Sequence, residues 1–337
     1  MTDQGELEFF LGMQVKRHFG RRKLLLNQAR YHSEILNRVS LSKCNAAPAP
    51  ADSKVILSKT MSPSNDEERA FVAAQKDHKS YPSLVGSISY TANSTRPDIT
   101  FAVNQTARFA ACAGPEHFKA VKKVFRYLKG TQNHGLLFGP NIFDPKGANH
   151  PSLFAFCDSD WARCPDTRRS TGSYQIWMFG APVLFRTFVD KSVSLSSAEA
   201  EYRTLSDLTK DILWTRKVVE FILDLKIQNP TSIYVDNQAA IAIANNPVSG
   251  KRSKHIEIRY HYTREMVAAG VIGIIYVPTR FNYADIGTKP LPAPRFMFLR
   301  DRMVHDNLLS KQPMLPEEKE FFTKNMPFPL DGPKNGF

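Results

Sequence analysis

The sequence contains few cysteines and no long apolar run. Its four cysteines among 337 residues form no Cys-x-x-Cys pair, which excludes a dense disulfide framework and argues against a zinc site. No stretch is apolar enough to cross a membrane, and the N-terminus, MTDQGELEFF, lacks the basic-then-apolar order of a signal peptide. We therefore expect an intracellular protein with no membrane partner and no targeting signal.

The sequence does carry a surplus of positive charge. The formal net charge is +13, and residues 1–150 supply most of it, with 21 basic and 12 acidic residues for +9. The remainder has 24 basic and 20 acidic residues, for +4. This asymmetry favours a polyanionic partner, although surplus charge also keeps a protein soluble.

Glycine and proline divide the chain near its middle. The stretch GPNIFDPKGANHP, residues 139–151, predicts a linker between two domains. Beyond it, apolar runs predict strands near 153–158, 172–179, 182–188, 232–236 and 271–277, and periodic stretches predict helices near 197–225, 238–245, 255–269 and 282–304. This order indicates an α/β domain with a mixed sheet. The tail from Ser310 onward mixes proline with charge, and we expect no fold of its own there.

The clearest helix of the first half is PEHFKAVKKVFRYLKG, residues 115–130, which a proline begins and a glycine ends. One face carries an apolar stripe, made of Phe118, Val121, Phe125 and Leu128. The opposite face carries a basic stripe that no acid interrupts, made of Lys119, Lys122, Lys123, Arg126 and Lys129. A stripe of one sign favours contact with phosphates, and a solvated face is the alternative.

Acidic side chains follow two of the predicted strands. In FCDSDWA, Asp158 and Asp160 come at the end of an apolar run, and in IYVDNQ, Asp236 does the same. A lone aspartate there is typical of a polar turn. Two at the carboxyl ends of strands, however, lie where α/β sheets place their ligand sites.

Two further acids belong to predicted helices. The helix that opens SSAEAEYRTLSDL has Ser196 or Ser197 as its N-cap, and Glu201 lies four residues before the core position Leu205. We therefore expect Glu201 to face the sheet and Glu199 to face away, where it stabilises the helix dipole. Asp285, in FNYADIG, fits an N-cap by itself. Four converging acids would need protons or metal ions among them.

Five ordered motifs make the chain recognisable. In this order, the motifs resemble the ribonuclease H domain of copia-type retrotransposon Pol polyproteins. They are CDSDWARCPDTRRST, LSSAEAEY, IYVDNQAAI, SKHIEIRYHYTRE and YADIGTKPL. Two upstream stretches look like the segment that joins reverse transcriptase to ribonuclease H in these polyproteins: YPSLVGSISYTANSTRPDITFAVNQTARF and AVKKVFRYLKGT. FLGM, residues 10–13, matches the primer grip of the polymerase.

The resemblance implies a domain plan. It gives the C-terminal part of a reverse transcriptase at 1–138, with a mostly helical thumb or connection segment, and a linker at 139–152. A ribonuclease H-like α/β domain with a mixed five-stranded sheet and flanking helices follows at 153–305. A disordered tail is expected at 306–337.

The resemblance also implies a metal-dependent endonuclease that hydrolyses the RNA strand of RNA/DNA hybrids. Its acidic quartet falls on Asp158, Glu201, Asp236 and Asp285 and would hold two Mg²⁺ ions, with Mn²⁺ as the alternative. Asp158 would bridge both ions, Glu201 and Asp236 would complete one, and Asp285 would support the other. Phosphate contacts are expected from Arg168 and Arg169.

The implied partners are the hybrid and the remainder of the Pol polyprotein, in the cytoplasm (virus-like particle) or the nucleus. No Tyr-x-Asp-Asp box precedes the primer grip, so we expect no reverse transcriptase activity and a truncated Pol fragment. The alternative is a catalytically decayed remnant that still binds nucleic acid.

The sequence departs from the family pattern at three places. Asp190 replaces a glutamine after the third strand, and Arg163 replaces a glycine that permits a tight turn. In STGSY, Gly172 and Ser173 are exchanged relative to the family. These changes leave the four acids intact and bear on the geometry of the first hairpin.

Overall fold

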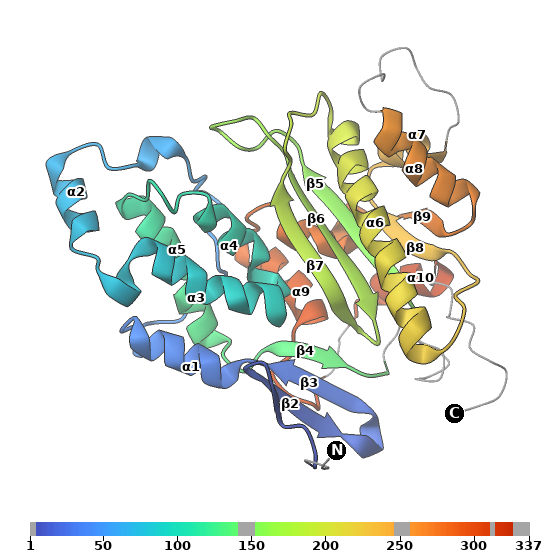
Figure 1. Cartoon of the computed structure of the whole chain (residues 1–337), viewed down its shortest axis with the longest axis horizontal. Helices are drawn as coiled ribbons and strands as arrows, with labels where there is room; N and C mark the ends of the chain where they lie inside the picture. Colours follow the sequence, from blue (N-terminus) through green and yellow to red (C-terminus); the bar gives the residue numbers. More distant parts are fainter. Residues whose placement is uncertain (1–4, 141–151, 246–256, 311–313, 326–337) are drawn as a thin grey trace. The chain divides into compact units, whose positions relative to one another are not determined.

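The structure is a computed structural model, and it describes residues 5–140, 152–245, 257–310 and 314–325, with only the backbone described for 257–261. The chain forms two compact units (Figure 1). Unit 1 comprises Met1–Phe138, Cys164–Thr167 and Lys289–Gln312, and unit 2 comprises Gly139–Arg163, Arg168–Thr288 and Pro313–Phe337. Within the described ranges, no helix combines the length and the apolar character that a membrane crossing needs.

Unit 1 contains a four-stranded antiparallel sheet in the order β1-β2-β3-β4. Its strands are β1 (Phe9–Phe10), β2 (Met13–His18), β3 (Lys23–Asn27) and β4 (Gly135–Phe138). The FLGM motif forms the tight turn between β1 and β2, where Leu11 and Gly12 both have positive φ. The short helix η1 (Phe19–Arg21) joins β2 to β3.

Helices form the rest of unit 1. They are α1 (Ala29–Arg38), η2 (Lys59–Met61), α2 (Asp66–Ala73), η3 (Asp77–Lys79), α3 (Tyr81–Ser94), η4 (Pro97–Ile99), α4 (Thr100–Ala107), α5 (Pro115–Gly130) and α9 (Ala293–Met303). The predicted bounds of α5 are confirmed, and its apolar stripe is buried. The core of unit 1 therefore forms where α5 meets α1, α3 and α4.

A buried ion pair lies inside this core. Arg96 and Asp98 have fully buried side chains, and their charged groups meet at 2.7 Å. The Tyr127 hydroxyl donates to Asp98 Oδ2 at 2.5 Å, and Arg96 also donates to the Thr131 carbonyl and hydroxyl, both at 2.8 Å. Burial opposes the charge of Asp98, but Arg96 and Tyr127 hold its pKa below the ordinary value.

Unit 2 contains a mixed five-stranded sheet in the order β7-β6-β5-β8-β9. The strands are β5 (Phe154–Asp160), β6 (Thr171–Met178), β7 (Ala181–Val189), β8 (Thr231–Val235) and β9 (Ile272–Tyr276). β5, β6 and β7 pair antiparallel, whereas β5, β8 and β9 pair parallel. The mixed five-stranded sheet predicted for a ribonuclease H-like domain is confirmed.

Helices pack on both faces of this sheet. They are α6 (Ser197–Leu223), α7 (Gln238–Asn245), α8 (Glu257–Ala268), η5 (Thr279–Phe281), η6 (Tyr283–Gly287) and α10 (Pro316–Lys324). Ala155 and Cys157 of β5 join the core under α6. Phe156, between them, faces the other side and contacts Phe322 of α10. This alternation is what a strand buried on both faces requires.

Two predictions about secondary structure are wrong in part. The helix expected at 282–304 is instead η6 followed by α9, because Pro290 and Pro292 lie between them and proline cannot continue a helix. The tail was expected to lack a fold of its own, yet residues 316–324 form α10.

The two units also interleave differently from the predicted domains. The first long segment of unit 1 ends at Phe138, and Lys289–Gln312 also groups with unit 1 although its first part was assigned to the second domain. Phe296 of α9 packs edge-on against Tyr127 of α5, which explains this grouping. Most of the predicted linker, residues 141–151, lies outside the described residues.

Candidate metal centre

Two aspartates meet because their strands are parallel neighbours. In the β5–β8 pairing, Cys157 lies opposite Val235, and the next residue on each strand is an acid, Asp158 and Asp236. The carboxyl ends of parallel strands lie at one edge of a sheet, so both carboxylates reach the same place. The sequence predicted a ligand site at this edge.

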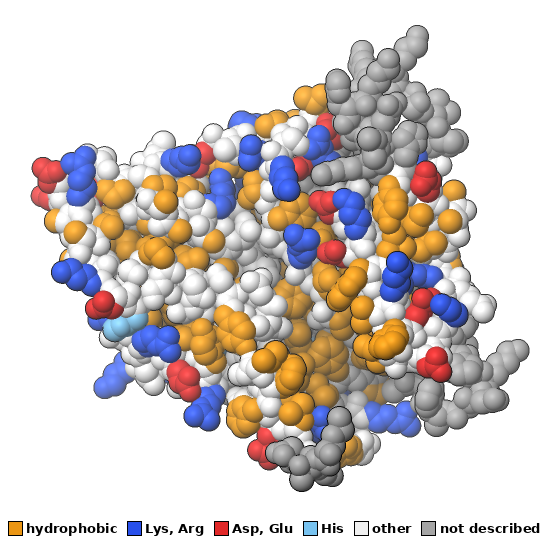
Figure 2. Space-filling view, viewed as in Figure 1, with side chains coloured by type: hydrophobic (Ala, Val, Ile, Leu, Met, Phe, Trp, Pro, Cys, Tyr) orange, Lys and Arg blue, Asp and Glu red, His pale blue; other side chains and the backbone are white. Residues whose placement is uncertain are grey.

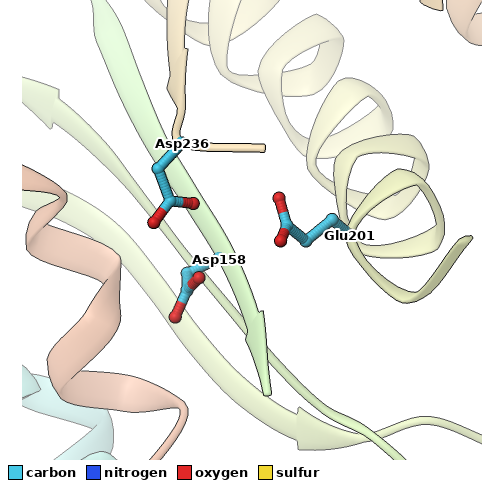
Figure 3. Close-up of side chains that lie close together, drawn as sticks. All are labelled: Asp158, Glu201 and Asp236. Carbon is cyan, nitrogen blue, oxygen red and sulfur yellow. The ribbon is translucent and has the colours of Figure 1, made fainter. Parts of the chain in front are cut away.

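Glu201 reaches this edge from α6. Of the two predicted N-caps, Ser196 is the one that caps the helix, because its hydroxyl accepts from the Glu199 N–H at 3.2 Å. Leu205, one turn beyond Glu201, is fully buried against the sheet and fixes the helix face. Glu201 consequently points toward Asp158 and Asp236 (Figure 3).

The three carboxylates form one compact cluster. Asp158 and Glu201 are buried, Asp236 is half-buried, and one oxygen from each lies within 4.8 Å of the others. Oδ1 of Asp236 is buried without a hydrogen-bond partner among the described atoms. Burial, followed by the charges of Glu201, Asp158 and Asp236, raises the pKa of the Cys157 thiol well above its ordinary value. Such a set of oxygen donors fits a hard divalent cation.

Two polar side chains orient these carboxylates. The Thr288 hydroxyl donates to Asp158 Oδ2 at 2.5 Å, and the Asn237 amide donates to Glu201 Oε1 at 3.1 Å. The side-chain oxygen Oδ1 of Asn237 also accepts from the Ala239 and Ala240 N–H groups at the start of α7. Sequence reasoning missed both roles, although Asn237 and Thr288 lie inside the two motifs that carry Asp236 and Asp285.

Glycine allows η6 to approach the sheet closely beside this cluster. A Cβ at Gly287 would lie 2.1 Å from Ser173 Oγ, and Ser173 is the register partner of Asp158. A Cβ at Gly172 would lie 2.5 Å from Oγ1 of Thr204 in α6. The order Gly172-Ser173, a departure from the family pattern, therefore suits the elements that pack here.

Asp285 lies in η6 and is 3% exposed. Its carboxylate is not part of the three-residue cluster. A short connection does exist, because the Thr288 hydroxyl contacts both the Asp285 carbonyl at 3.1 Å and the Asp158 carboxylate. The structure thus brings together three of the four predicted acids and places the fourth on the adjoining turn.

The neighbouring acids are bound to arginines. Asp160 pairs with Arg163 at 3.3 Å, so the residue that replaces a family glycine has a partner. The positive φ of this turn falls on Ala162, which leaves position 163 free to carry a side chain. Asp190, which replaces the family glutamine, pairs with Arg203 at 3.5 Å.

Glu199 has more contacts than the sequence predicted. It does not belong to the cluster, as expected, but it is buried instead of solvated. Its carboxylate accepts from the Leu195 N–H at 2.7 Å and pairs with Arg203 at 2.9 Å. Besides its predicted place in the first turn of α6, Glu199 therefore ties the β7–α6 connection to α6.

The predicted basic residues lie in both units. Arg168 and Arg169 are exposed between β5 and β6 in unit 2. In unit 1, the stripe on α5 is not free of acids as predicted, since Lys119 pairs with Glu116 and Lys123 pairs with Asp52 at 3.1 Å. On the face drawn in Figure 2, lysine and arginine side chains are scattered among acidic and hydrophobic ones.

Comparisons with known proteins point to one family, although no family model matches the chain. The retrovirus-related Pol polyprotein from transposon TNT 1-94 of Nicotiana tabacum is 33% identical over 309 residues, which is 91% of this chain and 22% of that protein. The corresponding polyprotein from transposon RE1 of Arabidopsis thaliana is 35% identical over 296 residues, 88% of this chain and 19% of that protein.

The chain spans about a fifth of the length of these curated relatives. Among solved structures, the N-terminal RNase H domain of a Mycobacterium tuberculosis protein, fused to maltose-binding protein, aligns with a TM-score of 0.31 and 14% identity. That alignment covers 40% of this chain and 89% of the solved one. From its sequence relatives, the chain belongs to the retrovirus-related Pol polyproteins of copia-type retrotransposons.

Proposed function

We propose that unit 2 is a ribonuclease H that hydrolyses the RNA strand of RNA/DNA hybrids with the help of divalent cations. The observation that carries the proposal is the cluster of Asp158, Glu201 and Asp236, whose carboxylate oxygens lie within 4.8 Å of one another at the carboxyl edge of the sheet. Three like charges so close are tolerated when protons or cations lie among them.

Mg²⁺ is the proposed cation, as two ions, with Mn²⁺ as the alternative. Carboxylate oxygens suit these hard ions, and the buried Asp236 Oδ1 offers a further ligand atom. Bound ions would supply charge stabilisation at the scissile phosphate and would lower the pKa of a coordinated water. Asp285 is proposed as an additional ligand from the adjoining turn.

The chain's own groups prepare this site. Thr288 and Asn237 hold the carboxylates of Asp158 and Glu201 in fixed orientations through hydrogen bonds. Outer contacts of this kind orient metal ligands and contribute to metal affinity. Cys157 stays a neutral thiol below the cluster, because burial and the three carboxylates raise its pKa.

We propose that the basic residues hold the hybrid through its phosphates. The exposed Arg168 and Arg169 belong to the connection that follows the Asp158 strand. In unit 1, the proposed contacts are those of the α5 stripe: Lys119, Lys122, Lys123, Arg126 and Lys129. Selection of RNA would come from its 2′-hydroxyls and the wide minor groove.

Cleavage of a labelled RNA strand annealed to DNA tests the proposal. Asp158→Asn keeps the shape of the side chain but removes its charge, so cleavage should fall by orders of magnitude while hybrid binding persists. Asp160→Asn, two residues along the same strand, is the matched control and should cleave like the wild type. Glu201→Gln and Glu199→Gln form a second pair on α6.

The alternative function is nucleic-acid binding without catalysis, as in a decayed remnant. It predicts a wild-type protein that binds the hybrid but leaves its RNA strand intact in Mg²⁺ and in Mn²⁺. The intact carboxylate cluster favours the enzyme. Equal cleavage by Asp158→Asn and by the wild type would instead show that this cluster is not the active centre.

A further inference from the structure

The helix α10 is too short to be stable by itself. Its nine residues, PEEKEFFTK, place a proline and two acids in the first turn and a lysine in the last, which suits a helix. Isolated helices shorter than about 12–15 residues are nevertheless marginal in water. Two side chains of α10 are buried, those of Glu318 and Phe322. The helix therefore depends on the surface against which these two side chains pack.

The partner of the buried Glu318 is Tyr283, the first residue of η6. The Tyr283 hydroxyl donates to Oε1 of Glu318 at 2.6 Å, and Oε2 accepts from the Leu315 N–H at 3.2 Å. Phe322 packs against the ring of the same tyrosine, with ring centroids 5.9 Å apart. A carboxylate is almost never buried without partners of this kind. The pairing therefore fixes where α10 lies on η6.

Tyr283 is also held from the side of the sheet. Its carbonyl accepts from the Gln175 amide of β6 at 3.1 Å, and its ring centroid lies 4.5 Å from that of Phe156 in β5. The preceding residue, Asn282, donates from its amide to the Cys157 carbonyl at 2.9 Å. Tyr283 is thus clamped between the sheet on one side and α10 on the other.

The turn that begins at Tyr283 carries groups of the metal centre. η6 is a five-residue 3-10 helix, and because the hydrogen bonds of such helices have poor geometry, packing decides its position. Asp285 lies two residues beyond Tyr283, and its carbonyl contacts the Thr288 hydroxyl that donates to Asp158. Among the residues that the structure describes, those of α10 contribute no carboxylate to the cluster. The link from α10 to the cluster therefore runs through η6.

We propose that α10 is a positioning element of the metal centre, in which Glu318 holds η6 through the Tyr283 hydroxyl. This bond keeps Asp285 and Thr288 in place beside Asp158. Outer contacts that orient ligands contribute to metal affinity. Because a docked α10 restricts η6 before an ion arrives, it also lowers the ordering cost of binding. The identity of the ion rests on the proposed function, whereas the link from α10 to η6 rests on these contacts.

The dissociation constant of Mn²⁺, measured without nucleic acid from the electron paramagnetic resonance signal of the free ion, tests this inference. Tyr283→Phe keeps the ring but removes the hydroxyl that reaches Glu318. The constant should rise about three- to tenfold, which is less than the roughly 10- to 100-fold effect of a direct outer partner. Phe322→Leu should act in the same direction, because it loosens α10 but keeps an apolar side chain in the core.

Glu318→Gln separates positioning from stability. Its amide oxygen still accepts from the Tyr283 hydroxyl, but its amide nitrogen cannot accept from the Leu315 N–H. The melting temperature should therefore fall while the Mn²⁺ affinity is retained. Glu317→Gln is the matched control, because it removes only a pair with Arg280 in which the side chains are 63% and 61% exposed. This variant should equal the wild type in both measurements.

Two outcomes would overturn the inference. If Tyr283→Phe and Phe322→Leu bound Mn²⁺ like the wild type and only melted earlier, α10 would be a purely structural cover. If Glu318→Gln lost as much affinity as Tyr283→Phe, the charge of Glu318 would matter instead of its hydrogen bond. The proposed function would survive either result as long as the wild type cleaves the hybrid. Weaker Mn²⁺ binding in both variants of a protein that never cleaves would remove the proposed function alone.

Discussion

Asp98 in unit 1 and Asp158 in unit 2 are both buried, with exposed fractions of 1% and 5%, yet their neighbours differ in charge. Asp98 contacts the guanidinium of Arg96 and the hydroxyl of Tyr127. Asp158 lies among the carboxylates of Glu201 and Asp236. Where the chain places a cation and a hydroxyl beside the buried carboxylate, that carboxylate holds the fold together. Where it adds further negative charge, the group of carboxylates is compatible with a divalent cation.

The two units should differ most in how their stability responds to acid. Burial, followed by the charge of Arg96, lowers the pKa of His32 to about 3 and of His134 to about 4. Burial and His134 lower the pKa of His305 to about 4. In the unfolded chain each histidine has a pKa near 6.5, so the unfolded state binds more protons between pH 6.5 and pH 4. The stability of unit 1 is therefore full above pH 6.5 and falls with decreasing pH by about 1.4 kcal/mol per pH unit for each histidine.

Hydrogen exchange between pH 7.5 and pH 5 measures this effect. Protection should be lost first in α5 of unit 1, because no histidine side chain that the structure describes lies in unit 2. His134→Gln should reduce the pH dependence by one proton. Equal loss of protection in α5 and α6 would contradict the assignment.

Breaking the ion pair of unit 1 should have the next largest effect. Asp98→Asn leaves the fully buried Arg96 without its counter-charge, and the expected loss is about 3–5 kcal/mol in the free energy of unfolding. Urea unfolding followed by circular dichroism measures it. Asp66→Asn is the control, because the Asp66–Arg69 pair lies at the surface and its loss should hardly move the midpoint. A similar midpoint for both variants would show that Arg96 finds another partner.

Removing one acid from unit 2 should have the opposite effect on stability. Asp236→Asn relieves repulsion among the three carboxylates, so its melting temperature in EDTA should exceed that of the wild type. Mg²⁺ at about a hundred times its dissociation constant should stabilise the wild type by about 2.7 kcal/mol, and this gain should be absent in the variant. Thermal scans with and without Mg²⁺ compare the two. A variant less stable than the wild type in EDTA would mean that Asp236 is structural, like Asp98.

The smallest expected effect concerns the hydroxyl that orients Asp158. Thr288→Val keeps the volume but removes the 2.5 Å hydrogen bond, and the Mg²⁺ concentration for half-maximal cleavage should rise about 10- to 100-fold. Thr288→Ser retains the hydroxyl and serves as the matched control. If both variants needed the same Mg²⁺ concentration, the bond from Thr288 to Asp158 would not contribute to Mg²⁺ affinity. The hydroxyl would then matter only through its contact with the Asp285 carbonyl.

Local patterns in the sequence predicted the sheet and much of the candidate site. Apolar runs located the five strands of unit 2, and counting back one turn from Leu205 placed Glu201 on the buried face of α6. Those predictions succeeded because strand period and helix period act over a few residues. The pairs Glu199–Arg203 and Asp160–Arg163 have spacings of four and three residues, which local reasoning could also have used. The pair Asp190–Arg203 could not be predicted in this way, since it depends on how the β7–α6 connection folds against α6.

Longer-range packing explains the remaining differences. α9 follows the motif of Asp285 directly in sequence, yet it packs on α5 of unit 1, more than 160 residues earlier in the chain. Asp52 likewise reaches Lys123 from more than 70 residues earlier in the chain, so that one member of the predicted basic stripe is ion-paired over a long range. Composition and periodicity carry no information about such contacts.

The position of α10 has a consequence for synthesis on the ribosome. This helix covers one face of the β5–β8 region, with Phe322 against Tyr234 and Glu318 accepting a hydrogen bond from Tyr283 at 2.6 Å. About 160 residues separate β5 from α10, which at about 5–20 residues per second takes on the order of 10–30 s to translate. Throughout that interval the rings of Phe156 and Tyr234 lack the edge-on cover of Phe322, although Tyr283 packs on Phe156 before α10 is made. The aromatic face of this sheet is therefore completed only when residues 316–324 emerge.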